Sequence, residues 1–373
     1  MLFDQDRQRG RGIVRSMTGV EHSDVVVVGL GPAGSRAAAK AAGSGRRVIG
    51  LDRRREAGVP VQCAEFIPAL LDQELDDLGH VTRQRVREMM TFVENETPDI
   101  KPNFPGRMIE RAKFDAALAA AAGAAGADCR FGAVVDNIAP DGRVQLNDGT
   151  IIRANVIIGA DGPRSRVGRA LGQINRHVVE TRQVTVPLIT PNESTDIFLS
   201  ADIVGGYGWL FPKGDNANLG VGVAPEAKGR LKPILEHLHS LLVTEGRVGK
   251  EILGHTGGPI PVGGMLDPIG NLGDVPVFLA GDAAGLANPV TGAGISAAVI
   301  SGGLAGEAAA ALLDGAVDAC DEYVEELADL FEPALRRALK RRQELLTYYQ
   351  TDAAPTPAAL RRGWIAYDEY WAA

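Results

Sequence analysis

Three short glycine-containing segments carry residues whose types and spacing suit chemistry, and the first suits the binding of a phosphate-bearing cofactor. It has the spacing Gly29-x-Gly31-x-x-Gly34, follows an apolar run over 24–28 and opens an alanine-rich run that reaches about residue 42. In such a segment the first glycine permits a tight turn, the second lets the backbone approach a pyrophosphate, and the third lets a helix pack on a sheet. Free N–H groups at the start of that helix attract phosphate.

Asp52 strengthens this interpretation. It ends a second apolar run, over 48–52, and lies 18 residues after Gly34, where an acid can accept hydrogen bonds from ribose hydroxyls. Strand, glycines, helix and acid occur in the order that a dinucleotide fingerprint requires, so a plain glycine turn is the weaker alternative. The segment therefore predicts a βαβ unit of the Rossmann type.

Each of the two other glycine segments places an acid at the end of an apolar strand. Asp161 follows the run 156–158, and the pair Gly281 and Asp282 follows the run 275–280. A short acid beside glycine can reach a ribose or ribitol hydroxyl because glycine leaves the approach open. Either pair alone would be an ordinary turn, but both lie downstream of the fingerprint.

A long helix is expected directly after the third segment. Gly292 and Gly294 lead into a run rich in glycine and alanine that extends to about residue 313. The positive end of this helix can face a flavin ring and favour the anionic reduced flavin. Together the three segments predict an FAD-binding protein. Since no histidine or cysteine attachment motif is present, the FAD is expected to be held non-covalently.

Residues 24–310 resemble the FAD-dependent hydroxylase and reductase superfamily of the p-hydroxybenzoate hydroxylase fold. Two further segments narrow the resemblance: Pro60-Val-Gln-Cys63-Ala-Glu and Tyr207-x-Trp209-x-Phe211-Pro. Together they resemble the geranylgeranyl reductase family, whose members reduce isolated C=C bonds in polyprenyl chains. In that family the cysteine segment runs beside the flavin and the aromatic segment lines the substrate cavity.

The resemblance also implies which side chains contact FAD. Arg111 stands in an Arg-x-x-Phe-Asp stretch like that of the family, whereas Val135 is matched by spacing only. The chain departs from the family at Asp52, where Glu is commoner, and at Phe66, where glycine is frequent and a ring would crowd the flavin region. The implied contacts are Ala33, Asp52, Cys63, Ala64, Arg111, Val135, Asp282, Gly294 and Ile295.

Tyr207, Trp209 and Phe211 have a second interpretation that needs no family. Side chains two apart on a strand share one face, so these three predict either an aromatic cavity wall or ordinary sheet core. Cys63 likewise has two interpretations: an inert buried thiol, or a proton donor to a carbon that has just received a hydride.

Three functions are compatible with these segments. The leading hypothesis is an FAD-dependent reductase of a prenyl or similar lipophilic alkene; the alternatives are an FAD-dependent aromatic monooxygenase and a non-catalytic flavin electron carrier. A pure carrier would need no substrate cavity. No second glycine fingerprint follows a strand, so a dedicated NAD(P)H domain is not expected, and both transiently docked NAD(P)H and a protein donor such as ferredoxin remain open.

The order of the patterns predicts an α/β protein: a Rossmann-type FAD-binding domain, an inserted antiparallel-sheet substrate domain and a helical C-terminal tail. Strand-like alternation between 176 and 225 interrupts the dinucleotide-type segments. The predicted divisions are a disordered extension over 1–23, FAD-binding segments over 24–65, 106–173 and 268–320, substrate segments over 66–105 and 174–267, and the tail over 321–373.

Composition excludes several other classes of protein. The formal net charge of −8 argues against a nucleic-acid binder. Three cysteines without CxxC spacing signal neither a metal site nor a disulfide framework and fit the cytoplasm. No apolar run reaches the ~18–20 residues of a membrane span.

A lipophilic substrate would nevertheless bring the enzyme to a bilayer, and the tail offers a basic cluster beside an apolar patch. Anionic lipid could bind the five bases Arg336, Arg337, Lys340, Arg341 and Arg342 beside Leu345, Leu346, Tyr348 and Tyr349. The favoured alternative is a solvated helix face paired with Glu325, Glu326 and Asp329.

Overall fold

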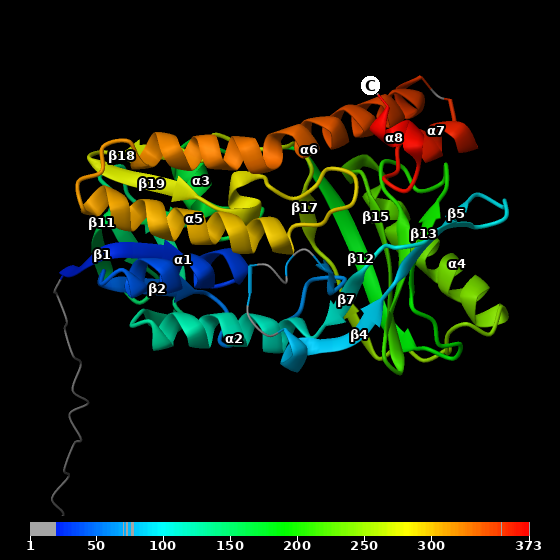
Figure 1. The fold of residues 1–373 in the computed structure, drawn as a ribbon, viewed down its shortest axis with the longest axis horizontal. Helices are drawn as coiled ribbons and strands as arrows, with labels where there is room; N and C mark the ends of the chain where they lie inside the picture. Colours follow the sequence, from blue (N-terminus) through cyan, green and yellow to red (C-terminus); the bar gives the residue numbers. More distant parts are fainter. Residues whose placement is uncertain (1–19, 70, 72–73, 76–77, 352, 373) are drawn as a thin grey trace, which may run out of the picture.

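Two large sheets and one small sheet build the molecule, which is a computed structural model that describes residues 20–69, 71, 74–75, 78–351 and 353–372. The first large sheet and its helices form one half, and the second large sheet forms the other (Figure 1). The predicted α/β fold class is confirmed.

The first sheet has the strand order β18-β19-β11-β1-β2-β8, and β10 and β9 extend it from β11. Strands β19, β11, β1, β2 and β8 run parallel, as expected for a Rossmann-type half. The strands are β1 (Val20–Val28), β2 (Val48–Asp52), β8 (Asp128–Phe131), β9 (Val135–Ile138), β10 (Val144–Leu146), β11 (Ile151–Gly159), β18 (Ile269–Leu272) and β19 (Val275–Leu279).

The first sheet differs from the sequence prediction at the N-terminal end of the chain. Residues 20–23, predicted to be disordered, form the start of β1 and pair with 151–154 of β11; residues 1–19 of that predicted extension lie outside the described residues. The chain over 128–138 is divided between β8 and β9 by a turn at Gly132, whose φ of +77° favours glycine.

The second sheet has the order β16-β12-β15-β14-β13-β5-β6, and β17 also pairs with β12. Most of its pairs are antiparallel, in the part of the chain where an inserted sheet is predicted. Its strands are β5 (Glu88–Val93), β6 (Asp99–Lys101), β12 (Val178–Pro187), β13 (Ser194–Leu199), β14 (Gly208–Lys213), β15 (Asn216–Val223), β16 (Gly254–Thr256) and β17 (Pro259–Pro261).

A small sheet, β3-β7-β4, contacts the second sheet through β14. It consists of β3 (Phe66–Pro68), β4 (Thr82–Val86) and β7 (Gly106–Ile109). Although 106–109 was predicted to belong to the FAD-binding part, β7 pairs with β3 and β4, and with no strand of the first large sheet in the described part of the chain.

Helices cover both halves, and α6 runs along the first half and on to the second (Figure 1). The predicted helical tail is observed as α6, α7 and α8. The helices are α1 (Pro32–Gly43), α2 (Arg111–Ala124), α3 (Arg166–Ala170), α4 (Leu231–Thr244), α5 (Ile295–Leu313), α6 (Ala319–Gln350), α7 (Pro357–Arg362) and α8 (Asp368–Trp371).

Helix α5 is apolar and long enough to cross a membrane, which the sequence reasoning overlooked, but 56% of its apolar stretch is buried inside the protein. It packs on α1 at unusually short range, because Gly302 and Gly306 face the backbone of α1. A methyl group on Gly302 would lie 2.1 Å from the carbonyl oxygen of Ala33, and one on Gly306 would lie 2.4 Å from that of Ala37. This packing identifies α5 as a core helix.

The contact between α1 and α5 predicts opposite effects of one methyl group at neighbouring positions. Gly302→Ala should lower the free energy of unfolding by about 1–3 kcal/mol because the helices must separate. Gly303→Ala is the control, since no atom lies within 4 Å of its added methyl group, and it should stabilise by about 0.5–1 kcal/mol through helix propensity. Urea unfolding measures both; equal effects would show that the close approach is unimportant.

Candidate cofactor site and active centre

The predicted fingerprint forms the turn between β1 and α1, at the edge where the carboxyl ends of the parallel strands meet. Gly29 has a φ of +92°, and its N–H donates to the carbonyl oxygen of Leu51 at 2.7 Å. A methyl group on Gly34 would lie 1.7 Å from the carbonyl oxygen of Gly29, so α1 can start here only with glycine. A methyl group on Gly31 would meet no atom within 4 Å. This open side is where a pyrophosphate fits against the start of α1.

Asp52 holds that turn in place. Its Oδ2 accepts a hydrogen bond from the Leu30 N–H at 2.8 Å and its Oδ1 accepts one from the Arg54 N–H at 2.7 Å. Each carboxylate oxygen has a second lone pair, so Asp52 remains able to accept from a ribose hydroxyl.

Asp161 also lies at this edge, but its carboxylate is occupied by the start of α3. It accepts from the Ser165 hydroxyl at 2.5 Å and from the Arg166 N–H at 2.6 Å. Burial raises the pKa of Asp161, and these hydrogen bonds oppose that rise. Its evident role is to cap α3, while the predicted contact with FAD stays a prediction.

Asp282 lies at the N-terminus of α5, next to the end of β19. Its Oδ1 is 3.1 Å from the position that a methyl group on Gly294 would occupy, and Gly281 N–H donates to the Ser301 hydroxyl at 2.9 Å. Burial raises the pKa of Asp282 to about 6, although the charge of Arg111 lowers it. Among the described residues the buried Ser296 hydroxyl, in the first turn of α5, has no hydrogen-bond partner. These polar groups suit a hydroxylated, anionic cofactor.

The other predicted cofactor contacts are distributed around the same region. Ala33 is buried in the first turn of α1, Gly292 (φ +68°) precedes α5, and Ile295 begins it. Val135 begins β9 and is buried in the core of the first half. Ala64 packs instead against a cluster of buried side chains in the second half that includes Trp209 and Phe211.

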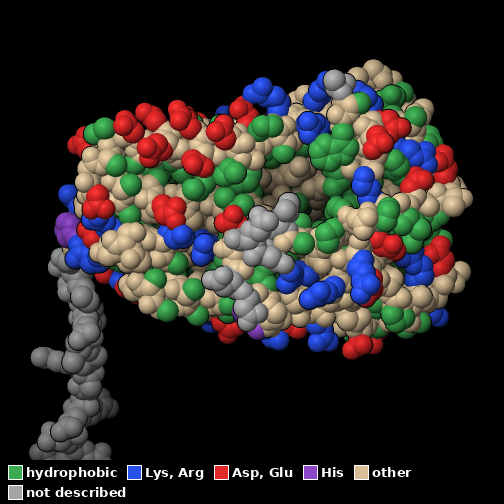
Figure 2. All heavy atoms as spheres, in the orientation of Figure 1, with side chains coloured by type: hydrophobic (Ala, Val, Ile, Leu, Met, Phe, Trp, Pro, Cys, Tyr) green, Lys and Arg blue, Asp and Glu red, His purple; other side chains and the backbone are tan. Residues whose placement is uncertain are grey.

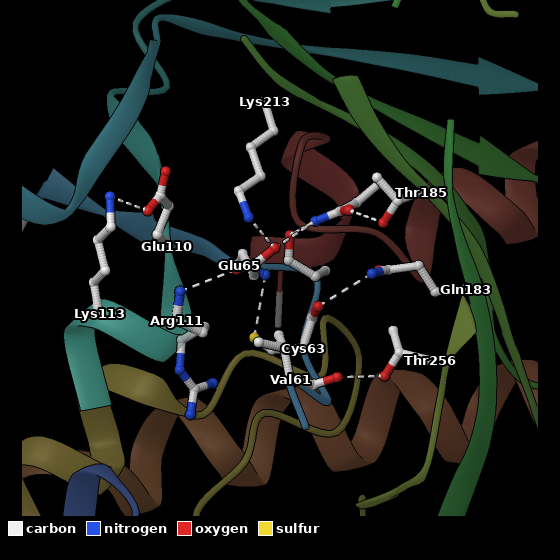
Figure 3. Close-up of polar contacts among 12 residues, drawn as sticks. Val61, Cys63, Glu65, Glu110, Arg111, Lys113, Gln183, Thr185, Lys213 and Thr256 are labelled. Atoms are coloured by element: carbon white, nitrogen blue, oxygen red, sulfur yellow. Dashed lines mark hydrogen bonds and ion pairs between the residues drawn. The ribbon is translucent and has the colours of Figure 1, made fainter. Parts of the chain in front are cut away.

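The segment 61–66 crosses from one half to the other, and side chains of the second sheet hold its backbone (Figure 3). The carbonyl oxygen of Val61 accepts from the Thr256 hydroxyl at 2.6 Å. That of Cys63 accepts from the Gln183 amide at 3.2 Å, and that of Ala64 accepts from the Asn218 amide at 3.1 Å.

Cys63 lies beside the charged start of α2. Its Sγ accepts a hydrogen bond from the Glu65 N–H at 3.1 Å and also faces the guanidinium group of Arg111. Arg111 forms two parallel bonds to Asp115, of 2.8 and 2.9 Å. Burial alone would lower the pKa of Arg111, but Cys63 and Asp115 raise it above its ordinary value. The guanidinium group therefore stays charged beside the sulfur.

Glu65, Lys213 and Asn218 form a buried polar cluster that the sequence reasoning missed. The Glu65 carboxylate accepts from Lys213 Nζ at 2.6 Å, from the Asn218 amide at 3.0 Å and from the backbone N–H of Arg111 at 3.0 Å. Its side chain is only 6% exposed. The available signal was an acid two residues after the predicted cysteine and a lysine directly after the aromatic segment.

Tyr207, Trp209 and Phe211 share one face, as predicted, with ring centroids 5.7 and 6.5 Å apart. Trp209 donates to the Gln183 side chain at 3.0 Å, so the aromatic face and the Cys63 segment share one amide. Trp364, in the tail, covers this face, and its ring centroid lies 4.7 Å from that of Tyr207. The sequence did not predict this contact. Burial raises the pKa of Tyr207 above its usual range, as does nearby Cys63.

Phe66 lies in the same cluster, with its ring 6.0 Å from that of Phe211 and stacked on Phe104 at 5.7 Å. A methyl group on Gly106 would lie 2.4 Å from that ring, so the phenylalanine and a glycine of β7 fit together.

Figure 2 shows a hollow between the two halves. Among the described residues, no group of three or more His, Cys, Asp or Glu side chains could hold a metal ion.

The predicted basic cluster of the tail is partly wrong. Arg341 is buried and donates to the carbonyl oxygens of Tyr370 and Ala372, because the end of the chain folds back onto α6. Arg342 donates to the carbonyl oxygen of Gly205 at 2.5 Å. Arg336 pairs with Glu332 at 2.5 Å, and among the described residues none of the five bases pairs with Glu325, Glu326 or Asp329, which was the favoured alternative.

Comparison with known proteins agrees with this geometry. Digeranylgeranylglycerophospholipid reductase 1 of Methanopyrus kandleri is 34% identical over 343 residues, which cover 83% of this chain and 88% of that protein. A geranylgeranyl bacteriochlorophyll reductase-like protein of Thermoplasma acidophilum superposes with a TM-score of 0.79 at 26% identity, covering 94% of this chain and 98% of that one. A probable FAD-dependent monooxygenase of Pseudomonas aeruginosa has a TM-score of 0.67 at 20% identity, covering 88% and 96%. No family model matches the chain.

The fold and the site define an FAD-dependent oxidoreductase of the p-hydroxybenzoate hydroxylase type. The likeness to the monooxygenase shows the fold alone. The identity and the coverage of the match to the reductases establish the family as well as the fold. The chain belongs to the geranylgeranyl reductase family of FAD-dependent enzymes.

The pKa of Asp282 predicts a pH dependence of stability in the FAD-free protein. Between pH 3.8 and about 6 the folded protein holds a proton on Asp282 that the unfolded chain has released, so this group lowers stability as pH rises through that range. Asp282→Asn removes the effect, and its stability relative to the parent should therefore increase across the same range and then level off. Urea unfolding at several pH values tests this.

Asp274→Asn, on the exposed turn between β18 and β19, is the matched control and should show no such trend. A stability difference between Asp282→Asn and the parent that stays constant with pH would contradict the proposed cost of burying the charge.

Proposed function

We propose that this enzyme reduces C=C bonds in the prenyl chains of a lipophilic substrate, of which a geranylgeranyl phospholipid is the best-supported example. The observation that carries the proposal is the position of Cys63, held between the cofactor edge and the aromatic face by Gln183, which also binds Trp209. The printed names of the relatives supply the substrate class.

The cofactor region suits FAD in the following way. Gly31 and the start of α1 would hold the pyrophosphate, Asp52 would accept from the ribose, and Asp282 would accept from the ribitol chain beside the N-terminus of α5. When bound and reduced, FAD supplies a hydride to one carbon of the alkene.

Cys63 supplies the proton in this proposal. Its Sγ–H bond breaks, the proton is transferred to the second alkene carbon, and the electron pair remains on sulfur as a thiolate. The Glu65 N–H, at 3.1 Å, and the guanidinium group of Arg111 stabilise that thiolate. The aromatic face of Tyr207, Trp209 and Phe211 holds the chain and excludes water.

Replacing Cys63 tests the proton step. Cys63→Ala should lower kcat by about 10²–10⁴-fold, the usual contribution of a general acid, while the protein keeps its FAD. The matched control is Cys129→Ala, because Cys129 lies on β8 away from the cluster. Unchanged turnover by Cys63→Ala would assign the proton to another group.

The aromatic face has its own test. Trp209→Phe removes the donor to Gln183 but keeps an apolar ring, so the KM for lipid should rise while FAD content stays at the parent level. Loss of FAD in parallel with activity would instead identify the face as structural core.

The aromatic monooxygenase is the less favoured function, because its support is fold similarity at 20% identity, whereas the reductases match at 34%. The carrier function leaves the aromatic face without a role.

Electrons come either from transiently docked NAD(P)H or from a reduced protein such as ferredoxin. Comparing the rates at which the two reduce the bound flavin separates these donors.

Peripheral contact with a membrane is part of the proposal, because a prenyl lipid must be collected from a bilayer. Arg341 is buried and Arg342 is half-buried, so Arg336, Arg337 and Lys340 are the bases that remain for such a contact. They lie near exposed Trp371, over whose ring Arg337 lies at 5.1 Å. Changing the three bases to glutamine should reduce sedimentation with anionic vesicles at low salt. Equal sedimentation would place the contact elsewhere.

The experiment that tests the proposed reaction avoids the unknown donor. The FAD-loaded enzyme is reduced anaerobically with dithionite and incubated with a geranylgeranyl phospholipid, and the lipid is examined by mass spectrometry. The expected product is heavier by two hydrogens for each bond reduced. An unchanged lipid, or addition of oxygen when air is admitted, would contradict the reductase and favour the carrier or the monooxygenase, respectively.

A further inference from the structure

The Glu65 backbone has an unusual conformation that depends on its side chain. Its φ is +69°, which costs a residue other than glycine of the order of 1–3 kcal/mol. In this conformation its N–H points at Cys63 Sγ, 3.1 Å away. Such strain persists only where the surroundings impose it, and here three donors from α2, β14 and β15 fix the carboxylate.

The charge of the same carboxylate is balanced by Lys213. Glu65 is 6% exposed and the Lys213 side chain 20% exposed, with 2.6 Å between the charged atoms. Buried charges are costly unless they are paired, so each partner needs the other. The pair also joins the two halves, because Lys213 ends β14 whereas Glu65 belongs to the crossing segment (Figure 3).

We propose that Glu65 and Lys213 are positioning residues that act through Cys63: their ion pair holds the sulfur at the cofactor edge and keeps the charge around it neutral. Neither residue touches the reacting atoms. The consequence for turnover rests on the proposed function, but the effect on the thiol does not.

Several charged groups face this region and define what each substitution would change. Cys63 faces Arg111, which is bound to Asp115 and close to Asp282, and lies near Tyr207. Glu110 also lies near Lys213, but its own partner is Lys113 at 2.5 Å.

The two partners should therefore shift the reactivity of Cys63 in opposite directions. Glu65→Gln leaves a positive charge and favours the thiolate, so the pH midpoint of alkylation by iodoacetamide should fall. Lys213→Met leaves a negative charge, so the midpoint should rise. About half to one pH unit is expected in each case, and the two shifts should cancel in the double variant.

The measurement uses the full-length, FAD-loaded protein with Cys129 and Cys320 changed to serine, so that only Cys63 reacts. Glu110→Gln and Lys113→Met are matched controls, because they remove single charges from an ion pair at the start of the same helix whose side chains are 29% and 63% exposed, so that solvent screens the effect more strongly. Their midpoints should stay close to that of the parent.

Lys213→Met alone risks misfolding, since it leaves an unpaired buried carboxylate. Lys213→Arg keeps the charge and should retain a midpoint near that of the parent, and the neutral double variant avoids the unpaired charge. FAD absorbance and thermal unfolding verify that each variant is folded.

In turnover assays, Glu65→Gln should lower kcat at least tenfold with little change in the KM for lipid. Shifts of the same sign, or no shift in folded variants, would overturn the proposal and make the pair a structural bridge only. Opposite shifts without any lipid reduction by the parent would support the positioning role and reject the proposed reaction instead.

Discussion

The structure depends on one constraint: the segment 61–66 crosses between the halves with its backbone carbonyl groups partly buried, and each must find a hydrogen-bond donor. The second sheet provides these donors from Thr256, Gln183 and Asn218. Because the donors belong to separate strands of one sheet, the segment is held along its length. The cofactor edge and the aromatic face are thereby fixed relative to each other.

Burial sets the electrostatics of the same region. Burial raises the pKa of Asp282 to about 6, whereas Arg111 stays charged through its bonds to Asp115. A permanent cation close to a sulfur and to a tunable carboxyl group suits a site where negative charge appears briefly, on the cofactor or on the thiol. The proposed transfer of a hydride and a proton to an apolar bond would need a charged cofactor edge that is separate from an apolar face, and the aromatic cluster of Tyr207, Trp209 and Phe211 is such a face.

The elements nearest to the fingerprint and the third glycine segment were predictable from the sequence. The fingerprint, Asp52 and the apolar runs over 48–52 and 275–280 gave β2, α1 and β19 nearly to the residue, because period and glycine spacing act over short distances. Gln183, Asn218 and Lys213 were missed because they meet the crossing segment from more than a hundred residues away.

Other differences have the same origin in long-range packing. Arg341 was expected at the surface but is buried because the final residues of the chain return to α6. Trp364 closes the aromatic face for the same reason. Asp161 shares its pattern with a cofactor ligand, and only the hydrogen bonds to the start of α3 reveal its capping role.

The most direct measurement is a crystal structure of the enzyme with FAD bound. The account predicts the pyrophosphate over Gly31, the ring system at the N-terminus of α5, and the Cys63 sulfur in direct contact with that ring, within about 4 Å. A flavin whose ring lies away from Cys63, or a crossing segment released from Gln183 and Asn218 when FAD binds, would contradict it.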